Sequence, residues 1–379
     1  MKLTSDVASM IVKRLKATIG HHINIMDEKG MVIASSDEER VNTIHTGAIE
    51  VLQSKKERII EEQLPLLPGT RPGVNLPIEF LDEIIGVVGI TGNPKELLQL
   101  AQMTKITVEL IIQQDYLKKH AFFEQQLMHS WIMELISTND LNEEKLTKEA
   151  KHFLQIDLKI AYTVLVLEVF TLSSINDDLW AINEKKEAIL SALPLTKMDI
   201  SFASFTNEEL LVVGIPSDEL SVANDFYRLL KGLNAKLFST LKIGVGNSKI
   251  GLIGIRESYK EARQCVHLMN KFSTDKTISQ IQSWGLIRLL DEIKPSVREE
   301  FLAQYQVGNL PLHLRETLEA LIENNHNIND TSKKLHIHRN TLHYRLENIE
   351  QLTGLHPKTM NGLALLHILL IFDKLRETF

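Results

Sequence analysis

The feature that most constrains the fold is a stretch near the end of the chain, residues 327–346, whose pattern predicts two short helices joined by a tight turn. Asn327 can act as an N-cap, and Asp330 follows it close to the spacing of a capping box. The first helix then places three residues on one face: Ile328, Thr331 and Leu335. We therefore expect a helix that begins directly after Asn327.

The turn and the second helix follow at once. His336 and Ile337 are expected to form the turn, and the second helix should begin near His338. Its apolar residues are spaced four and three apart, at Leu342, Leu346 and Ile349. Because this stripe must face the first helix, the pattern predicts a helix-turn-helix.

The opposite side of the second helix carries polar side chains. From His336 to Leu346, both included, there are two arginines, three histidines and no acid. Such a helix end can reach base edges in a major groove while its neighbours hold phosphates. We therefore expect double-stranded DNA as a partner, contacted by His338, Arg339, Asn340, Thr341, His343, Tyr344 and Arg345.

Two other interpretations of this stretch remain open. A helix-turn-helix can also bind protein, which would make the chain a scaffold. The histidines suggest zinc, but His338 and His343 are five residues apart, about 140° around a helix, and neither a nearby cysteine nor an HExxH motif accompanies them. We expect no metal site.

Length and charge limit the class of protein. With 379 residues the chain should hold two to four domains, and its net charge of −7 argues against a general polyanion binder. Residues 311–379 contain eight Lys and Arg against eight Asp and Glu. One such module should bind DNA modestly, which favours a homodimer that presents two.

The single cysteine and the hydropathy pattern indicate where the protein works. Cys265 has no partner for an internal disulfide, which fits a reducing cytosol. We see no signal peptide and no run of about 18 apolar residues. The nearest candidate, 363–372, is interrupted by His367 and reads as a core or dimer helix. A cytoplasmic protein with no membrane partner is expected.

The region 1–118 alternates helices and strands. A hairpin is expected at 22–35, turning at Gly30, and a second one at 74–90. The patterns also predict helices at 4–19 and 43–53, a strand at 58–61 and a long helix from Pro94 to about 135. Helices that flank an antiparallel sheet are typical of small-molecule sensors of the PAS or GAF kind.

Three segments of this region have the residues for a small carboxylate, namely 35–48, 71–78 and 87–92. They supply arginines, hydroxyls, an amide and glycines that let the backbone approach a ligand. The alternative is that the arginines pair with surface acids and that the glycines only form turns. The candidate effector residues are Ser35, Arg40, His45, Arg71, Gly73, Val74, Asn75, Thr91 and Gly92.

The middle of the chain, 155–270, reads as a second α/β unit. Strands are expected at 159–167, 200–204, 210–214 and 241–248, and Ser258 is expected to open a helix. Gly244-Val-Gly246 is a weak sign of a phosphate loop, because this pattern mostly marks a turn.

The order of residues in the helix-turn-helix adds a resemblance to these patterns. The segment His-Ile-His-Arg-Asn-Thr-Leu-His-Tyr-Arg-Leu, 336–346, resembles the terminal helix-turn-helix of the purine-catabolism-regulator type. The likeness extends over about 317–372. It departs at Ser332, where that class commonly has Ala.

The N-terminal region resembles the sugar-diacid recognition domain of bacterial carbohydrate diacid regulators. The likeness covers most of 5–114 and includes Ile23-Asn-Ile-Met-Asp27, His45-Thr-Gly-Ala48 and Pro72-Gly-Val-Asn-Leu-Pro-Ile78. It implies an effector such as D-glycerate, glucarate or galactarate. The sequence departs from the family pattern at Val41-Asn42, where Ile-Gly is common.

The middle region resembles the degenerate nucleotide-cyclase-like domain of the same regulators. Its segment 206–209 lacks the Gly-Gly-Asp/Glu-Glu-Phe signature, so cyclase chemistry has no support. We expect an α+β multidomain protein with a PAS/GAF-like sensor, a degenerate cyclase-like α/β domain and an all-α helix-turn-helix. The expected domains are 1–118 for sensing, 119–153 as helical linker, 154–275 as GGDEF-like domain, 276–310 as connector and 311–379 for DNA binding.

Together these expectations describe an effector-responsive regulator of transcription for sugar diacid or glycerate utilisation. No catalytic residue and no cofactor are expected. The alternative from another class is a cyclase or phosphodiesterase with a DNA-binding tail.

Overall fold

The computed structural model describes residues 2–61, 71–137, 140–169, 179–193, 199–207, 210–216, 223–228, 241–272, 276–306, 308 and 310–376. The chain divides into two compact units, Met1–Phe123 and Glu124–Phe379.

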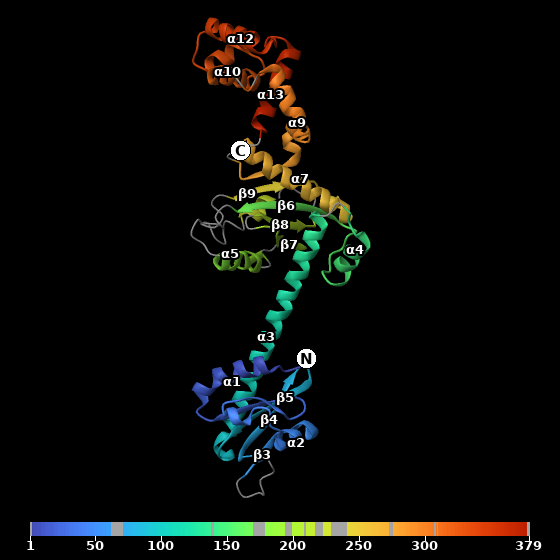
Figure 1. Ribbon diagram of the computed structural model, residues 1–379, viewed down its shortest axis with the longest axis vertical. Coiled ribbons are helices and arrows are strands. Elements are labelled where there is room, and N and C mark those ends of the chain that lie inside the picture. Colours follow the sequence, from blue (N-terminus) through green and yellow to red (C-terminus); the bar gives the residue numbers. More distant parts are fainter. Residues whose placement is uncertain are drawn as a thin grey trace. The chain divides into compact units, whose positions relative to one another are not determined.

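Unit 1 contains a five-stranded antiparallel sheet in the order β2-β1-β5-β4-β3 (Figure 1). Both expected hairpins are confirmed, and Gly30 has the positive φ of 78° that the first turn needs. The expected helix at the start of the chain and the long helix after Asn93 are confirmed as well. The elements are α1 Ser5–Ile19, β1 His22–Met26, β2 Val32–Ser35, η1 Glu38–Arg40, α2 Thr46–Ser54, β3 Arg58–Ile60, β4 Gly73–Phe80, β5 Glu83–Thr91 and α3 Pro94–Ser137.

The sheet of unit 1 is covered on both faces. One face packs against α1 and the first turns of α3, through residues such as Ile11, Ile25 and Val108. The other face has a smaller apolar cluster beneath α2, which includes Met26 and Val51. Since neighbouring residues of a strand point to opposite faces, the polar residues of the second face lie side by side.

Helix α3 crosses the limit that we expected for the sensing domain. It continues from Pro94 to Ser137, so position 118 lies inside it, and the expected linker 119–153 also contains α4, Glu143–His152.

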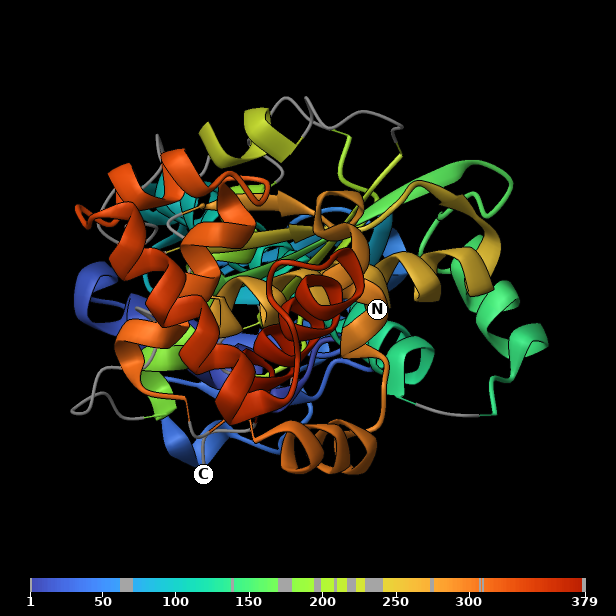
Figure 2. The ribbon, with the colours of Figure 1, turned by 90° about the horizontal axis from the view of Figure 1, so that it is seen from above.

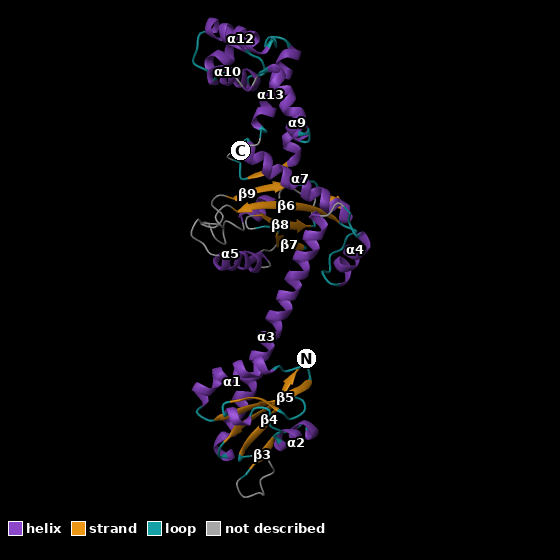
Figure 3. Ribbon diagram, viewed as in Figure 1, coloured by secondary structure: helices purple, strands orange, loops and turns teal. Residues whose placement is uncertain are grey.

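The second sheet belongs to unit 2 and has the path β11-β9-β6-β8-β7, with β10 paired to β6 (Figure 3). The expected buried strands are confirmed at nearly the predicted places. The elements are β6 Ala161–Val169, α5 Leu179–Ala192, β7 Phe202–Phe205, β8 Leu210–Ile215, β9 Leu241–Val245, β10 Lys249–Ile250, α7 Gly251–Lys271 and β11 Ile278–Gln280.

The expectation that Ser258 opens a helix is wrong, because α7 begins seven residues earlier at Gly251. Ser258 lies in the helix interior with no exposed surface, and its hydroxyl accepts a hydrogen bond of 3.0 Å from the Val164 amide. A Cβ on Gly246 would lie 2.1 Å from the Ser258 carbonyl oxygen. The Gly-Val-Gly sequence thus allows strand β9 to pack tightly on α7.

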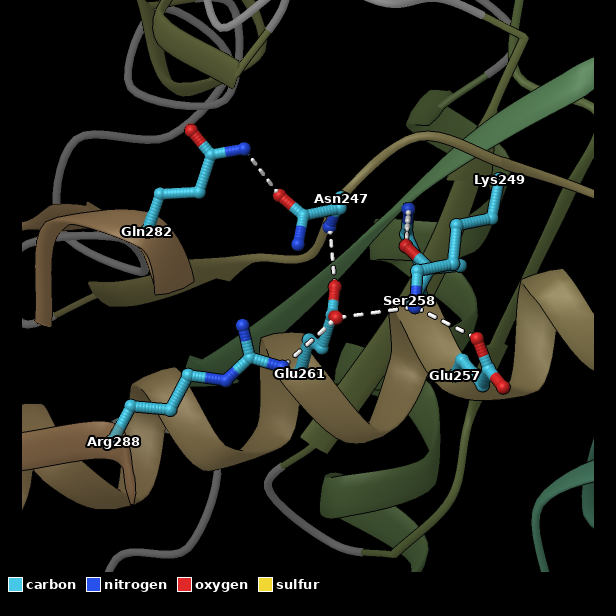
Figure 4. Close-up of polar contacts among 8 residues, drawn as sticks. Asn247, Lys249, Glu257, Ser258, Glu261, Gln282 and Arg288 are labelled. Atoms are coloured by element: carbon cyan, nitrogen blue, oxygen red, sulfur yellow. Dashed lines mark hydrogen bonds and ion pairs between the residues drawn. The ribbon is translucent and has the colours of Figure 1, made fainter. Parts of the chain in front are cut away.

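A polar network ties α7 to the segment from Asn247 to Lys249, at strand β10, and to the helix that contains Arg288 (Figure 4). The Glu261 carboxylate accepts a hydrogen bond from the Asn247 amide at 2.8 Å and lies 3.2 Å from Lys249 and 3.1 Å from Arg288. Burial alone would raise the pKa of Glu261, but the Asn247 amide and the Lys249 ammonium outweigh it and lower this pKa. Because Arg288 belongs to α8, Gly285–Asp291, the network anchors the connector to α7.

Beyond β11 the described residues form helices only (Figure 3). After η3, Ile281–Trp284, and α8 come α9 Pro295–Tyr305, α10 Leu312–Glu323, α11 Ile328–Lys334, α12 Arg339–Thr353 and α13 Met360–Lys374. Their shared apolar core includes Leu318, Leu346 and Leu369, and the orange and red helices can be followed in Figure 2. Within the described part of the chain, no helix has the length and apolar character that crossing a membrane requires.

Candidate effector site and nucleic-acid interface

A row of polar and small residues crosses the α2 face of the first sheet. The strand register aligns five residues from β2 to β3: Ser35, Asn24, Gly89, Asn75 and Arg58. Ser35 Oγ donates a hydrogen bond of 2.6 Å to Asn24 Oδ1. Asn24 and Asn75 are only 2% and 4% exposed. Two buried amides on one sheet face form a polar surface in what would otherwise be a hydrophobic layer.

The N-terminus of α2 lies directly over this row. A Cβ on Gly47 would be 3.3 Å from Asn75 Nδ2 and 3.2 Å from His45 Cε1, and a Cβ on Gly89 would be 2.5 Å from Asn75 Oδ1. The glycines at these two positions therefore make space for the Asn75 amide. His45 caps the helix, since its Nδ1 accepts a hydrogen bond of 3.2 Å from the Ala48 amide.

Two arginines add positive charge beside this helix end. Arg40 is 9% exposed, and its pKa is lowered by burial and by the nearby Arg71, against the opposing effect of Asp37. Arg71 is half exposed and lies 3.2 Å from the Asp37 carboxylate. The two guanidinium groups repel each other, so a bound anion between them would be stabilised.

His45 is neutral in this environment. Burial lowers its pKa to about 4, and the charge of Arg40 adds to the effect. At neutral pH the ring can therefore accept a hydrogen bond at Nδ1, as it does from Ala48, and donate one at Nε2. A neutral donor next to two cations suits an acid that also has hydroxyl groups.

A cavity of about 670 Å³ opens at the neighbouring end of the sheet. Its lining includes Arg71, Thr91 and Gly92, which the sequence predicted. It also includes Asn93 and Lys95 at the start of α3, and Glu61 after β3, which the sequence analysis missed. The Asn93 side chain accepts a hydrogen bond of 3.3 Å from the Lys95 amide, a capping pattern that could have drawn attention to it.

The structure groups most of the predicted effector residues into two neighbouring sets. The first set lies at the α2 end and contains Arg40, His45 and Asn75, with Ser35 in the same row as Asn75. The second set lines the cavity and contains Arg71, Thr91 and Gly92. Arg71 joins the two sets, because it lines the cavity and its charge also acts on Arg40. Gly73 pairs with Thr91, and a Cβ there would lie 2.1 Å from the Ile90 carbonyl oxygen, so it permits close strand pairing.

Val74 does not belong to either set. Its side chain is fully buried in the core of the opposite face, beneath α1 and α3. Because strand residues alternate between faces, a neighbour of Asn75 must point away from it. We therefore remove Val74 from the candidate residues. Asn24 is the buried amide that the sequence analysis missed.

The helix-turn-helix forms as predicted. The Asn327 side chain caps α11 by accepting hydrogen bonds from the Asn329 and Asp330 amides, and His338 caps α12 by accepting one from the Asn340 amide. The turn between the helices passes through His336, whose φ is 54°. Leu342, Leu346 and Ile349 are fully buried, as the stripe required.

The expected DNA-contacting residues divide into an exposed set and one exception. His338, Arg339, Asn340 and Thr341 are exposed, Tyr344 is 64% exposed, and His343 is partly buried. Arg345 instead turns toward α10, where its Nη1 donates hydrogen bonds to Thr317 Oγ1 at 3.1 Å and to the His313 carbonyl oxygen at 3.3 Å. Arg345 thus joins two helices, and we move it from DNA reading to packing.

Three family descriptions match successive parts of the chain. Residues 3–135 match putative sugar diacid recognition, 138–268 match a GGDEF-like domain, and 314–372 match the PucR C-terminal helix-turn-helix domain.

Curated relatives cover nearly the whole chain. The carbohydrate diacid regulator of Escherichia coli is 29% identical over 384 residues, which is 99% of this chain and 99% of that protein. An uncharacterized protein of Haemophilus influenzae is 28% identical over 369 residues, 94% of this chain and 95% of that one. The purine catabolism regulatory protein of Bacillus subtilis is 27% identical over 127 residues, 32% of this chain and 24% of that one.

These similarities confirm the resemblance that the sequence carried. The names agree with a DNA-binding regulator of transcription and not with an enzyme. The chain is a homologue of the carbohydrate diacid regulator of Escherichia coli, and it matches the putative sugar diacid recognition domain, the GGDEF-like domain and the PucR C-terminal helix-turn-helix domain in this order.

Proposed function

We propose that the protein is a cytoplasmic regulator of sugar diacid or glycerate utilisation genes that responds to a small hydroxy-carboxylate. Unit 1 acts as a sensor of the PAS or GAF kind, and the effector is an acid such as D-glycerate, glucarate or galactarate. Its antiparallel sheet with helices on both faces supports this assignment, since such folds enclose small ligands. The proposed domains are 1–118 for sensing, 119–153 as helical linker, 154–275 as GGDEF-like domain, 276–310 as connector and 311–379 for DNA binding.

One observation carries the choice of an acid. Arg40 is nine-tenths buried and lies close enough to Arg71 for the second charge to lower its pKa. A carboxylate placed between them would form charge-assisted hydrogen bonds and relieve this repulsion. The N-terminus of α2 favours the same negative charge.

The neighbouring polar row suits the hydroxyl groups of the effector. Asn24 and Asn75 are buried amides that can both donate and accept, and neutral His45 adds a donor. A molecule with a carboxylate at one end and hydroxyls along its length matches both parts. A simple fatty acid would leave the amides unpaired, which costs binding energy.

The output of the proposed regulator is DNA binding by a homodimer. The exposed tip of α12 offers Arg339, Asn340 and Tyr344 to a major groove. Effector binding would shift the balance between two arrangements of the dimer and so change how two recognition helices match two half-sites.

A thermal-shift screen tests the sensing part. We expect D-glycerate, glucarate or galactarate to raise the melting temperature of the full chain, and propionate to leave it unchanged. Arg71→Ala should abolish the shift, whereas Arg14→Ala, an exposed arginine on α1, should retain it. If none of the hydroxy-acids raises the melting temperature, or if Arg71→Ala keeps the full shift, the effector is not bound at this site.

A further inference from the structure

Helix α3 exposes a stripe of large apolar side chains within unit 1. Met103 is 68% exposed, Ile106 57%, Leu110 59% and Leu117 58%. We call these four residues the α3 stripe. Scattered single apolar residues are common on surfaces, but a contiguous line of them usually marks a binding surface.

The stripe lies opposite the face that holds the helix on its own domain. Leu97, Ala101, Thr104, Val108 and Ile112 are at most 2% exposed, and the apolar members of this group belong to the core of unit 1. Leu110 lies two residues from both Val108 and Ile112, about 200° around the helix. One face of α3 therefore already packs in the core of unit 1, and the stripe is a second apolar face that this core does not cover.

The spacing of the stripe is that of a coiled coil. Met103, Leu110 and Leu117 are seven residues apart, and Ile106 lies three after the first and four before the second. Gln113 takes the next equivalent position and is exposed. Apolar residues with a period of 3.5 pair with another helix that has the same period, and one polar residue in such a seam fixes the register.

We propose that the α3 stripe is the surface through which two copies of this chain dimerise. A second copy provides an identical stripe, so both helices gain a partner with matching spacing at once. The proposal rests on the proposed function in one respect, because the homodimer required to read two half-sites needs a self-complementary surface. It names that surface.

Leu110 is the position at which this pairing is most easily tested. It stands midway between Met103 and Leu117, so in a parallel, in-register pair of α3 helices it faces its own copy across the two-fold axis. Two like charges placed there would be forced together, while opposite charges would attract.

The experiment uses three full-length variants. Leu110→Glu and Leu110→Lys place a charge in the stripe, and Lys118→Glu is the control, since Lys118 is exposed and lies outside the stripe. Size-exclusion chromatography with light scattering measures the mass of each variant and of an equimolar mixture of Leu110→Glu with Leu110→Lys. Circular dichroism checks that each is folded.

We expect wild type and Lys118→Glu to be dimers and each Leu110 variant alone to dimerise at least about 10-fold more weakly. The mixture should form dimers again, which a folding defect would not produce. A monomeric wild type, Leu110 variants that stay dimeric, or folded variants whose mixture remains monomeric would each overturn the proposal. The acid-induced thermal shift is read separately, so loss of that response alone contradicts only the sensing function.

Discussion

Arg345 Nη1 donates a hydrogen bond of 3.1 Å to Thr317 Oγ1, and this contact joins the recognition helix α12 to α10. Thr317 is fully buried, so the guanidinium satisfies a hydroxyl inside the bundle. Arg339 lies six residues earlier on the same helix and is exposed. Two arginines six residues apart thus have different surroundings, since one packs against α10 and the other is exposed.

Replacing Arg345 should affect stability more than DNA reading. Arg345→Ala removes the hydrogen bonds to Thr317 and to the His313 carbonyl oxygen, and we expect it to lower the free energy of unfolding by about 1–2 kcal/mol. Urea denaturation measures the change. DNA affinity per folded molecule should remain within about 3-fold of wild type, and a larger loss with unchanged stability would return Arg345 to the DNA surface.

Replacing Arg339 should have the reverse effect. Arg339→Ala removes an exposed side chain at the tip of α12, so the melting temperature should stay constant. Affinity for operator DNA should fall by about 1–3 kcal/mol if Arg339 contacts a base. Fluorescence anisotropy at several salt concentrations makes the measurement. Unchanged affinity at matched salt would remove Arg339 from the readout.

Asn75 should be required for effector binding. Asn75→Ala deletes the amide that Gly47 and Gly89 leave room for. We expect the apparent affinity for the acid, measured from the thermal shift at several acid concentrations, to fall at least about 10-fold. Asn270→Ala is the matched control, because Asn270 is an exposed amide in unit 2. A normal thermal shift in Asn75→Ala would place the hydroxyl contacts elsewhere.

The stability of unit 1 should depend on pH through His45. Its pKa is about 4 in the folded protein against an ordinary value of 6.5, so between these values the unfolded chain binds more protons than the folded one. Stability should therefore be full above about pH 6.5 and be lost as the pH falls toward 4, by on the order of 3 kcal/mol. His45→Asn keeps a helix-capping side chain but does not titrate, so its urea-melting curves should vary less over this window. An equal pH dependence in both proteins would assign the effect to other groups.

Gly246 should be needed for packing in the middle domain. A Cβ there would lie 2.1 Å from the Ser258 carbonyl oxygen, which is backbone and cannot swing aside. Gly246→Ala should thus destabilise unit 2 by about 2 kcal/mol or more. Gly20→Ala is a useful comparison, since a Cβ at Gly20 meets nothing within 4 Å and only the positive φ opposes it. If Gly246→Ala melts like wild type, tight packing is not the reason for this glycine.

Local patterns in the sequence were enough to predict many elements of the fold, although not the start of α7 at Gly251. The hairpin at Gly30, the cap at Asn327 and the apolar stripe from Leu342 to Ile349 depend on side-chain spacing and on backbone angles of a few neighbouring residues. Such interactions act within one or two turns, so the chain order alone reveals them. The resemblance to a family of regulators also came from contiguous motifs.

Tertiary structure decided which of these residues meet. Asn24 and Asn75 are 51 positions apart, and only the strand order β2-β1-β5-β4-β3 brings them into one row beneath the N-terminus of α2. The same strand pairing sends Val74 into the opposite core, and the packing of α12 on α10 turns Arg345 inward. These outcomes depend on contacts between distant segments, whose register no local pattern encodes.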